Sequence, residues 1–367
     1  MNFAILVKSQ EQAPGAPQDI PGVSAVAEWT QEHDALVYAS PSDVYVHEGR
    51  LLCNGWSPDL AQRSWLWMEN IALDAVYNRF PRRRDPEGLD RVAHLCDELD
   101  IPFANHPSFR ALVRDKWETA QLLAEAGLRV PETVLTWSDI PGAMLRWGRA
   151  FLKPRYGAFG EDVYVLTQET PERLTIEGPV AGVFQQVETQ TLLTWLHNHF
   201  VEGEVVVQRA ISPPSVRWKG FAVRTLWQRG EDLLWNPYPR VARVSEDDPV
   251  ANVDRGANAT PLRDCLVQEY GVEHAGVLEE QATVLERDVI SALLASLPSL
   301  SSGSVIEMGM DLLLDAEGRW WLLEVNGFPQ GRLRYLARFS LPEFVAAHHR
   351  AHCSPLAALR SFVLQSS

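Results

Sequence analysis

The chain has 367 residues, enough for two or three packed domains rather than one small module. Its composition, 46% hydrophobic and 22% charged, is ordinary globular usage and excludes fibrous and wholly disordered proteins. Its 33 Lys and Arg residues against 48 Asp and Glu give a formal charge of -15, so neither nucleic acid nor an anionic membrane is an expected partner.

Targeting and covalent features are few. The apolar run at residues 3–7 is followed by Lys8 and is too short for the core of a signal peptide. No stretch reaches the roughly 18 apolar residues of a membrane span. The cysteines are scattered without a CxxC pair, which predicts neither a disulfide framework nor a zinc site. We therefore expect a cytoplasmic protein.

The first third of the chain alternates short apolar strands with helical periodicity. Strands are predicted at residues 3–7, 35–39 and 74–78, and helices at 90–99 and 116–126. The turn at 81–86 carries three consecutive arginines, which either face solvent or contact an anionic substrate. The alternation predicts an α/β domain at the N-terminus.

From about residue 133 onward, strand patterns prevail. Four strands are predicted, at residues 150–153, 162–166, 204–208 and 221–227, and two more flank the turn at 315–318. A long helix over 277–297 precedes the last pair. This part of the chain is therefore predicted to be α+β, with largely antiparallel sheets.

The most informative stretch is the predicted hairpin around residues 315–318. A tight turn there places Asp311 opposite Leu322, and alternation puts both on one face with Glu324 and Asn326. Two carboxylates and an amide oxygen make a hard-oxygen site that suits Mg²⁺. A solvated strand end is the alternative, and a β-bulge would shift the register. The opposite face is predicted to be apolar and buried, with Met310, Leu312, Leu314, Trp321, Leu323 and Val325.

A second informative stretch begins at Lys153. This lysine ends a predicted strand and precedes a loop bounded by Gly157 and Gly160. Glycine lets backbone N–H groups approach phosphate oxygens, and the lysine supplies positive charge. The pattern indicates a flap over phosphates, although an ordinary hairpin turn also accounts for it.

Taken together, these motifs resemble the ATP-grasp superfamily, and in particular its glutathione synthetase-like members. The resemblance rests on Lys153-Pro-x-x-Gly-x-x-Gly, the strand ending in Gln208, the interior Arg224, and Asp311 with Glu324-Val-Asn326. Residues 105–133 resemble the segment leading into the ATP-binding region, and Val76-Tyr-Asn-Arg79 resembles the YheC/YheD-like, spore-coat-associated group.

The resemblance implies an α/β and α+β architecture, the ATP-grasp fold, with a nucleotide bound between two α+β lobes. It divides the chain into an N-terminal pre-ATP-grasp domain (1–104), a small lid subdomain with its leading helix (105–210), a C-terminal subdomain with the Mg²⁺ site (211–350) and a C-terminal tail (351–367). A homodimer is a further expectation from the resemblance.

The resemblance also implies roles for particular residues. Lys116 and Lys153 would contact the nucleotide phosphates, and Arg224 and Arg243 would act with Lys153 on the transferred phosphoryl group. Asp311, Glu324 and Asn326 would hold one or two Mg²⁺. The flap would be Gly157, Ala158, Phe159 and Gly160, and the hinge that reads adenine through its backbone would be Gln208, Arg209, Ala210 and Ile211. Candidate substrate contacts are Arg79, Arg217, Asn252, Gly256 and Arg332.

Read without the resemblance, several of these arginines have simpler explanations. Arg224 is compatible with an ion pair at a strand edge, and Arg243 and Arg217 are compatible with solvent-facing loops.

The implied activity is an ATP-dependent carboxylate–amine ligase. It would form an amide or peptide bond through an acyl phosphate and release ADP and phosphate, with small-molecule or peptide substrates. Two alternatives are a kinase that stops at phosphorylation and a non-catalytic nucleotide-binding scaffold in a coat or surface assembly.

Overall fold

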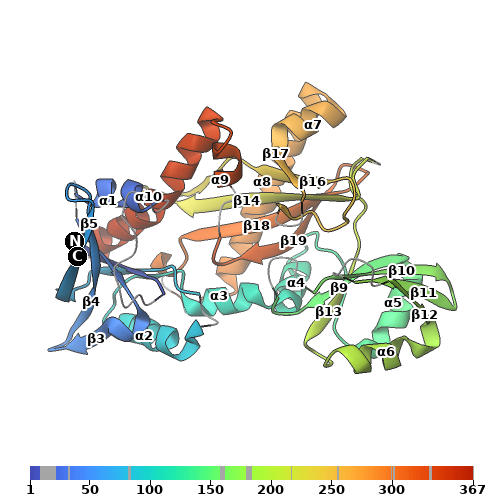
Figure 1. Ribbon diagram of the computed structural model, residues 1–367, viewed down its shortest axis with the longest axis horizontal. Helices are drawn as coiled ribbons and strands as arrows, with labels where there is room; N and C mark the ends of the chain where they lie inside the picture. Colours follow the sequence, from blue (N-terminus) through green and yellow to red (C-terminus); the bar gives the residue numbers. More distant parts are fainter. Residues whose placement is uncertain are drawn as a thin grey trace.

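The computed structural model describes residues 1–8, 22–31, 34–81, 84–157, 162–178, 184–215, 217–253, 256–298, 300, 302–329 and 333–366. These residues form three sheets, which we call the N-terminal, middle and C-terminal sheets. In Figure 1 the N-terminal sheet lies at the left and the middle sheet at the lower right, with the strands of the C-terminal sheet above and between them.

The N-terminal sheet has a parallel core and an antiparallel extension. The three strands predicted in the first third of the chain are present and run parallel to one another in the order β2-β1-β6. The extension was not predicted, because its strands are partly exposed and lack a clear alternation. The strands are β1 (Asn2–Leu6), β2 (Ala35–Ala39), β3 (Val44–His47), β4 (Arg50–Asp59), β5 (Ser64–Ala72), β6 (Ala75–Asn78) and β7 (Phe103–Ala104), and the helices are α1 (Val23–Gln31) and α2 (Pro86–Glu98).

The middle sheet is antiparallel throughout and packs on two short helices. Its core joins Met144 and Leu196 from those helices to Leu152 and Leu166 from the strands, all of them fully buried. The strands are β8 (Thr133–Val134), β9 (Arg149–Pro154), β10 (Tyr164–Thr170), β11 (Arg173–Glu177), β12 (Phe184–Glu188) and β13 (Val205–Arg209), and the helices are α5 (Ile140–Trp147) and α6 (Leu192–His199).

The C-terminal sheet is also antiparallel, and one of its faces packs against the long helix α8 (Val272–Ala295). Helices α3 (Pro107–Arg114) and α4 (Lys116–Glu125) lie against β19. The strands are β14 (Gly220–Arg229), β15 (Trp235–Pro237), β16 (Val241–Ser245), β17 (Asn258–Pro261), β18 (Glu307–Leu314) and β19 (Trp320–Asn326), with α7 (Leu262–Tyr270) and α9 (Leu333–Ala337) beside them.

The last helix, α10 (Pro342–Ser366), joins the C-terminal sheet to the N-terminal sheet. Phe344 packs near Leu226 of β14, whereas Leu356 and Leu359 pack on Phe3 of β1. The predicted boundary of a tail at residue 351 therefore falls inside a helix, and residues 351–366 are its second half. Among the described residues no helix combines the length and the apolar character needed to cross a membrane.

The register predicted for the β18–β19 hairpin was wrong by one residue near the turn. Leu312, rather than Asp311, lies opposite Leu322, and a bulge then brings Asp311 opposite Glu324. As a result Leu322 and Trp320 are buried on the apolar face with Leu312, where Trp321 and Leu323 had been expected. The two carboxylates nevertheless meet, because the bulge shifts the ladder between them and the turn.

Candidate active site

Asp311 is the centre of a buried group of charges on the C-terminal sheet. Arg224 of β14 donates from Nε to Oδ1 at 2.6 Å and from Nη2 to Oδ2 at 2.8 Å, and Arg243 of β16 donates from Nη2 to Oδ1 at 2.8 Å. Burial alone would raise the pKa of Asp311, but the two arginines hold it well below its ordinary value. Asp311 is therefore a carboxylate. Arg224 and Arg243 are both buried, and Arg243 lies in a strand rather than in a solvent-facing loop.

Glu324 and Asn326 extend this site along β19. Glu324 lies opposite Asp311, and Asn326 lies opposite Gly309. The Asn326 amide nitrogen is buried without a hydrogen-bond partner among the described residues. A buried amide nitrogen without a hydrogen-bond partner is costly. A 180° flip of the side-chain amide would put its oxygen in the position of this nitrogen.

These three residues fit a hard divalent cation. Carboxylate and amide oxygens are the ligands Mg²⁺ takes, and it commonly uses one or two carboxylates with water or phosphate completing its shell. Among the described residues, Asp311 Oδ2 accepts a hydrogen bond from Arg224 alone, so this oxygen has a second lone pair for a cation. The part of the chain that the structure describes contains no group of three or more His, Cys, Asp and Glu residues suited to a metal, so a cation here would need oxygens from a ligand as well.

Two lysines lie near Glu324 from different elements. Lys116 is the first residue of α4, and Lys153 is on β9 of the middle sheet. Burial lowers the pKa of Lys153 to about 8, and although Glu324 opposes this effect, Lys116 adds to it. Burial also lowers the pKa of Lys116, again against the effect of Glu324. Both predicted phosphate-binding lysines are thus brought to the predicted carboxylate.

Gln208 orients Lys153 through its side chain, a role that the sequence did not reveal. The Lys153 ammonium donates to Gln208 Oε1 at 2.7 Å, and Gln208 Nε2 donates to Thr133 Oγ1 at 3.1 Å. The partner is a neutral amide, so it fixes the ammonium group without cancelling its charge. The hydrophobic strand pattern around 204–208 predicted the position of Gln208 but not the cross-strand contact.

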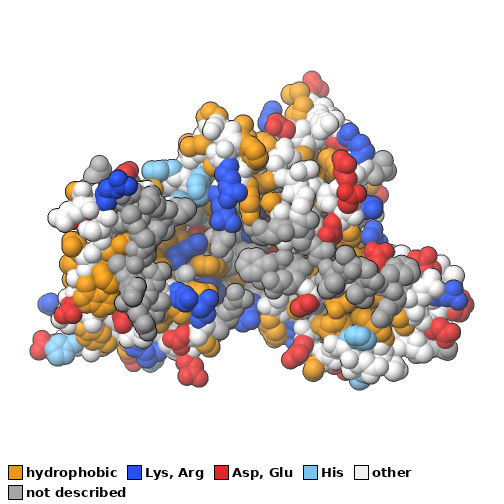
Figure 2. Space-filling view, in the orientation of Figure 1, with side chains coloured by type: hydrophobic (Ala, Val, Ile, Leu, Met, Phe, Trp, Pro, Cys, Tyr) orange, Lys and Arg blue, Asp and Glu red, His pale blue; other side chains and the backbone are white. Residues whose placement is uncertain are grey.

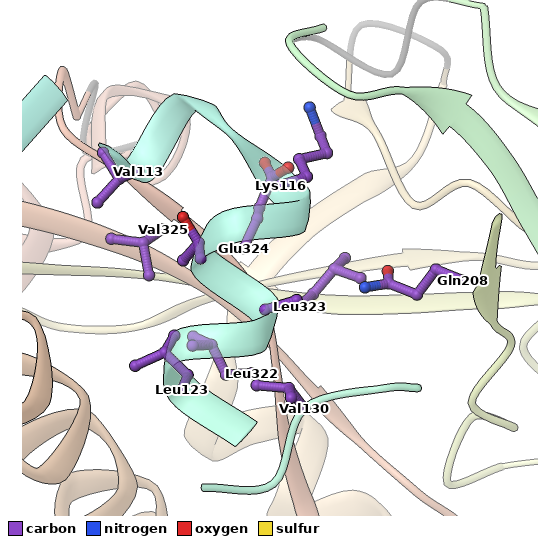
Figure 3. A pocket seen from close by; sticks show the side chains of 11 residues that line it. Val113, Lys116, Leu123, Val130, Gln208, Leu322, Leu323, Glu324 and Val325 are labelled. Carbon is purple, nitrogen blue, oxygen red and sulfur yellow. The ribbon is translucent and has the colours of Figure 1, made fainter. Parts of the chain in front are cut away.

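A pocket opens between these elements. It is lined by α4, β19 and Gln208, and Figure 3 shows Lys116 and Glu324 near each other at one end with Gln208 to the side. Its lining combines apolar side chains with Lys116, Thr119, Gln208 and Glu324. The lining residues are Val113, Lys116, Thr119, Ala120, Leu123, Val130, Gln208, Leu322, Leu323, Glu324 and Val325.

The turn that follows Lys153 is attached to the start of α4. Asp115 caps α4 by accepting from the Trp117 and Glu118 backbone, and it also accepts from Arg155 Nε at 2.8 Å and Nη2 at 2.6 Å. The Lys116 ammonium donates to the Gly157 carbonyl. Asp115 and Arg155 were missed; only the helix-cap pattern at Asp115 was visible in the sequence.

The remaining predicted residues differ in placement. Arg217 forms an exposed ion pair with Glu269 at 2.8 Å, away from the carboxylates. Asn252 is buried and Gly256 has φ +95°, in the turn between β16 and β17. Arg209 ends β13, with Ala210 and Ile211 directly after it. Ala158, Phe159, Gly160 and Arg332, which were also predicted to belong to the site, lie outside the described residues.

Arg79 lies at the junction with the N-terminal sheet. It donates from Nη1 to Glu307 at 3.0 Å and to the Pro329 carbonyl at 3.4 Å. Beside it, the buried Asn105 side chain accepts from the Ile306 backbone and donates to the Glu307 and Gly327 carbonyls. Asn105 was not predicted as a site residue. It fixes the backbone one residue beyond Asn326, because its bonds span β18 and the end of β19.

The sequence model of the family described as YheC/D-like ATP-grasp matches residues 101–338. The endospore coat-associated protein YheD of Bacillus subtilis (strain 168) is 23% identical over 294 residues, which are 75% of this chain and 59% of that protein. The chain thus spans about three fifths of the length of this relative.

Two further proteins are similar over different extents. A probable alpha-L-glutamate ligase of Mannheimia succiniciproducens is 41% identical over 66 residues, 18% of this chain and 22% of that protein. The D-alanine–D-alanine ligase of Bacillus anthracis, solved in complex with ATP, is 13% identical with a TM-score of 0.53, covering 100% of this chain and 99% of the ligase. At that identity the likeness concerns the fold alone.

Proposed function

The chain belongs to the YheC/D-like ATP-grasp family, and from this premise we propose that it is an ATP-dependent carboxylate–amine ligase that releases ADP and phosphate. The observation that carries the proposal is the meeting of Lys116 and Lys153 with Glu324, directly beside Asp311 and its two arginines. Cationic groups from α4, β9, β14 and β16 and anionic groups from β18 and β19 converge here, which is the arrangement that phosphoryl transfer requires.

In the proposed reaction, a substrate carboxylate oxygen attacks the γ-phosphorus of ATP, and ADP leaves. An amine then attacks the acyl carbon, loses a proton and expels phosphate to give the amide. Lys153, held by Gln208, would bind the phosphates as a fixed charge. Arg224 and Arg243 would neutralise the charge that develops on the transferred group.

Mg²⁺, when bound, would neutralise the charge of the nucleotide phosphates. Asp311, Glu324 and Asn326 would hold it. We propose that the ion pair between Asp115 and Arg155 holds the middle sheet, and with it Lys153, close to α4 and the carboxylates.

The experiment is a measurement of ADP release from Mg·ATP with paired amino acids and short peptides as carboxylate and amine. We expect ADP release that depends on both substrates, together with an amide product detected by mass spectrometry. A stable acyl phosphate or phosphate ester formed without an amine would instead favour a kinase. ATP binding with no ADP release under any pairing would contradict catalysis and favour a scaffold, as suggested by the coat association of YheD.

A further inference from the structure

The carboxyl ends of the parallel strands in the N-terminal sheet face the loop that follows Asn326. Arg79 comes directly after β6, and Asn105 directly after β7, which pairs with β6. Asn105 in turn binds the Gly327 carbonyl at 2.9 Å. Crevices at this edge of α/β sheets are where ligands bind, and here the edge lies beside the proposed metal site.

Arg79 is fixed at this edge, and part of its side chain is exposed. Within the described residues its hydrogen bonds to Glu307 and Pro329 both leave from Nη1. Its side chain remains 26% exposed, whereas that of Glu307 is 2% exposed. Gln228 also donates to Glu307, at 3.0 Å, so Glu307 is shared. Glu307 and the Tyr77 hydroxyl therefore orient the guanidinium group, and part of the side chain stays exposed.

Phe328 joins Arg79 to a second arginine. The guanidinium carbon of Arg79 lies 4.3 Å from the centre of the Phe328 ring, and that of Arg110 lies 4.8 Å from it. Phe328 is two residues after Asn326, about 7 Å of extended chain. A Cβ on Gly327 would come within 2.8 Å of Val113 and 3.2 Å of the Arg110 Cα, so α3 is packed directly on this loop.

Further basic residues lie between this pair of arginines and Lys116, which lines the pocket beside α4. Arg114 lies one helical turn after Arg110 on α3, and its charge acts on Lys116 at the start of α4. Figure 2 shows Lys and Arg side chains around the hollow at the centre of this face. The whole chain carries a formal charge of -15, so basic residues gathered along one path are a local exception.

We propose that Arg79 and Arg110, on Phe328, recognise an anionic group of a substrate, and that the preferred substrate carries an acidic group in addition to its reacting carboxylate or amine. The acidic side chain of a glutamate or aspartate, free or in a short peptide, has this chemistry. The inference rests on the proposed ligase function and names its substrate class.

The test compares acidic substrates with their neutral amides. L-glutamate and L-glutamine, and the peptides Ala-Glu-Ala and Ala-Gln-Ala, are titrated in the ADP-release assay with Mg·ATP. Binding of the same four compounds to the full-length protein is measured by calorimetry without nucleotide. We expect each acidic compound to have at least tenfold higher kcat/KM or affinity than its amide. We also expect this preference to fall at least tenfold in Arg79→Gln and Arg110→Gln and to be largely kept in Arg79→Lys.

Arg146→Gln is the matched control, because Arg146 is an exposed arginine on α5, which belongs to the middle sheet. Thermal melting of each variant separates loss of recognition from loss of folding. Equal use of acidic and neutral compounds with normal ADP release would overturn the inference and leave the ligase standing. If no ADP is released but the acidic compounds still bind more tightly than their amides, the ligase proposal is wrong and the anion site is supported. No preference in either measurement would overturn the site.

Discussion

Glu324 lies directly opposite Asp311 in the antiparallel pair of β18 and β19, and the ladder shifts by one residue immediately beside this pair. The two carboxylates are compensated from different directions. Asp311 binds the arginines of its own sheet, whereas Glu324 faces the lysines of α4 and β9. This division makes Glu324 the carboxylate that can be removed without breaking a buried ion pair.

Replacing Glu324 by Ala or Gln should abolish ATP turnover and leave the fold intact. We expect kcat to fall by roughly 10²–10³ or more, because the variants lack the negative charge that would bind the metal and that lies near Lys116 and Lys153. Glu317→Gln, in the exposed hairpin turn, is the control. ADP release and far-UV circular dichroism check the prediction. Near-normal ATP consumption by the Glu324 variants would refute the metal assignment.

Removing Asp311 should instead destabilise the protein. Asp311→Ala leaves Arg224 and Arg243 buried without their shared carboxylate, which we expect to lower the free energy of unfolding by about 3–5 kcal/mol. Urea denaturation measures the loss. The double variant Arg224→Met/Asp311→Leu should recover part of it, since an apolar pair replaces an ion pair; a double variant less stable than Asp311→Ala would contradict this account.

Asp311 should also make stability depend on pH. Its pKa is lower in the folded chain than in the unfolded chain, because the arginines outweigh the effect of burial. The stabilisation is therefore complete above the unfolded-state pKa of about 4 and is lost as pH falls below it. We expect the free energy of unfolding of the natural protein to decline more steeply below about pH 4 than that of Asp311→Asn. Parallel slopes would argue against the ion pair.

Lys153 should couple ATP binding to proton uptake. Its folded-state pKa of about 8 lies below the unfolded value of about 10.4, so the free energy of unfolding without ligand should rise with pH across this window. Phosphate favours the charged lysine, so ATP affinity should fall as pH rises through 8. Calorimetry in buffers of different ionisation enthalpy, at about pH 8.5, measures the uptake. Lys153→Met should show none of it.

Gly327→Ala should impair the site through packing alone. The added methyl group would lie 2.8 Å from Val113 Cγ2, a short branched side chain with little room to move. We expect the free energy of unfolding to fall by about 1–3 kcal/mol, and the Mg²⁺ concentration for half-maximal ADP release to rise, because Asn326 is adjacent. Gly276→Ala on α8, where nothing lies within 4 Å of the new Cβ, is the control. Unchanged Mg²⁺ dependence would show that the loop absorbs the methyl group.

The sequence by itself determined the fold family and the identity of the charged residues. Runs of apolar and β-branched residues located the strands that carry Lys153, Gln208, Arg224 and Asp311, and the helix predicted at 116–126 appears as α4 (Lys116–Glu125). These signals are local, since each depends on residues a few positions apart. The residue types at the strand ends were therefore enough to predict a cationic and carboxylate site.

Only the tertiary structure decided which of these groups meet. The hairpin register, the bond from Lys153 to Gln208, and the sharing of Asp311 by two arginines each depend on contacts between distant strands. The same holds for Arg79 and Arg110, which lie far apart in sequence and meet on Phe328. A one-residue shift exchanges the two faces of a strand, so composition and periodicity cannot determine such contacts without the packed core.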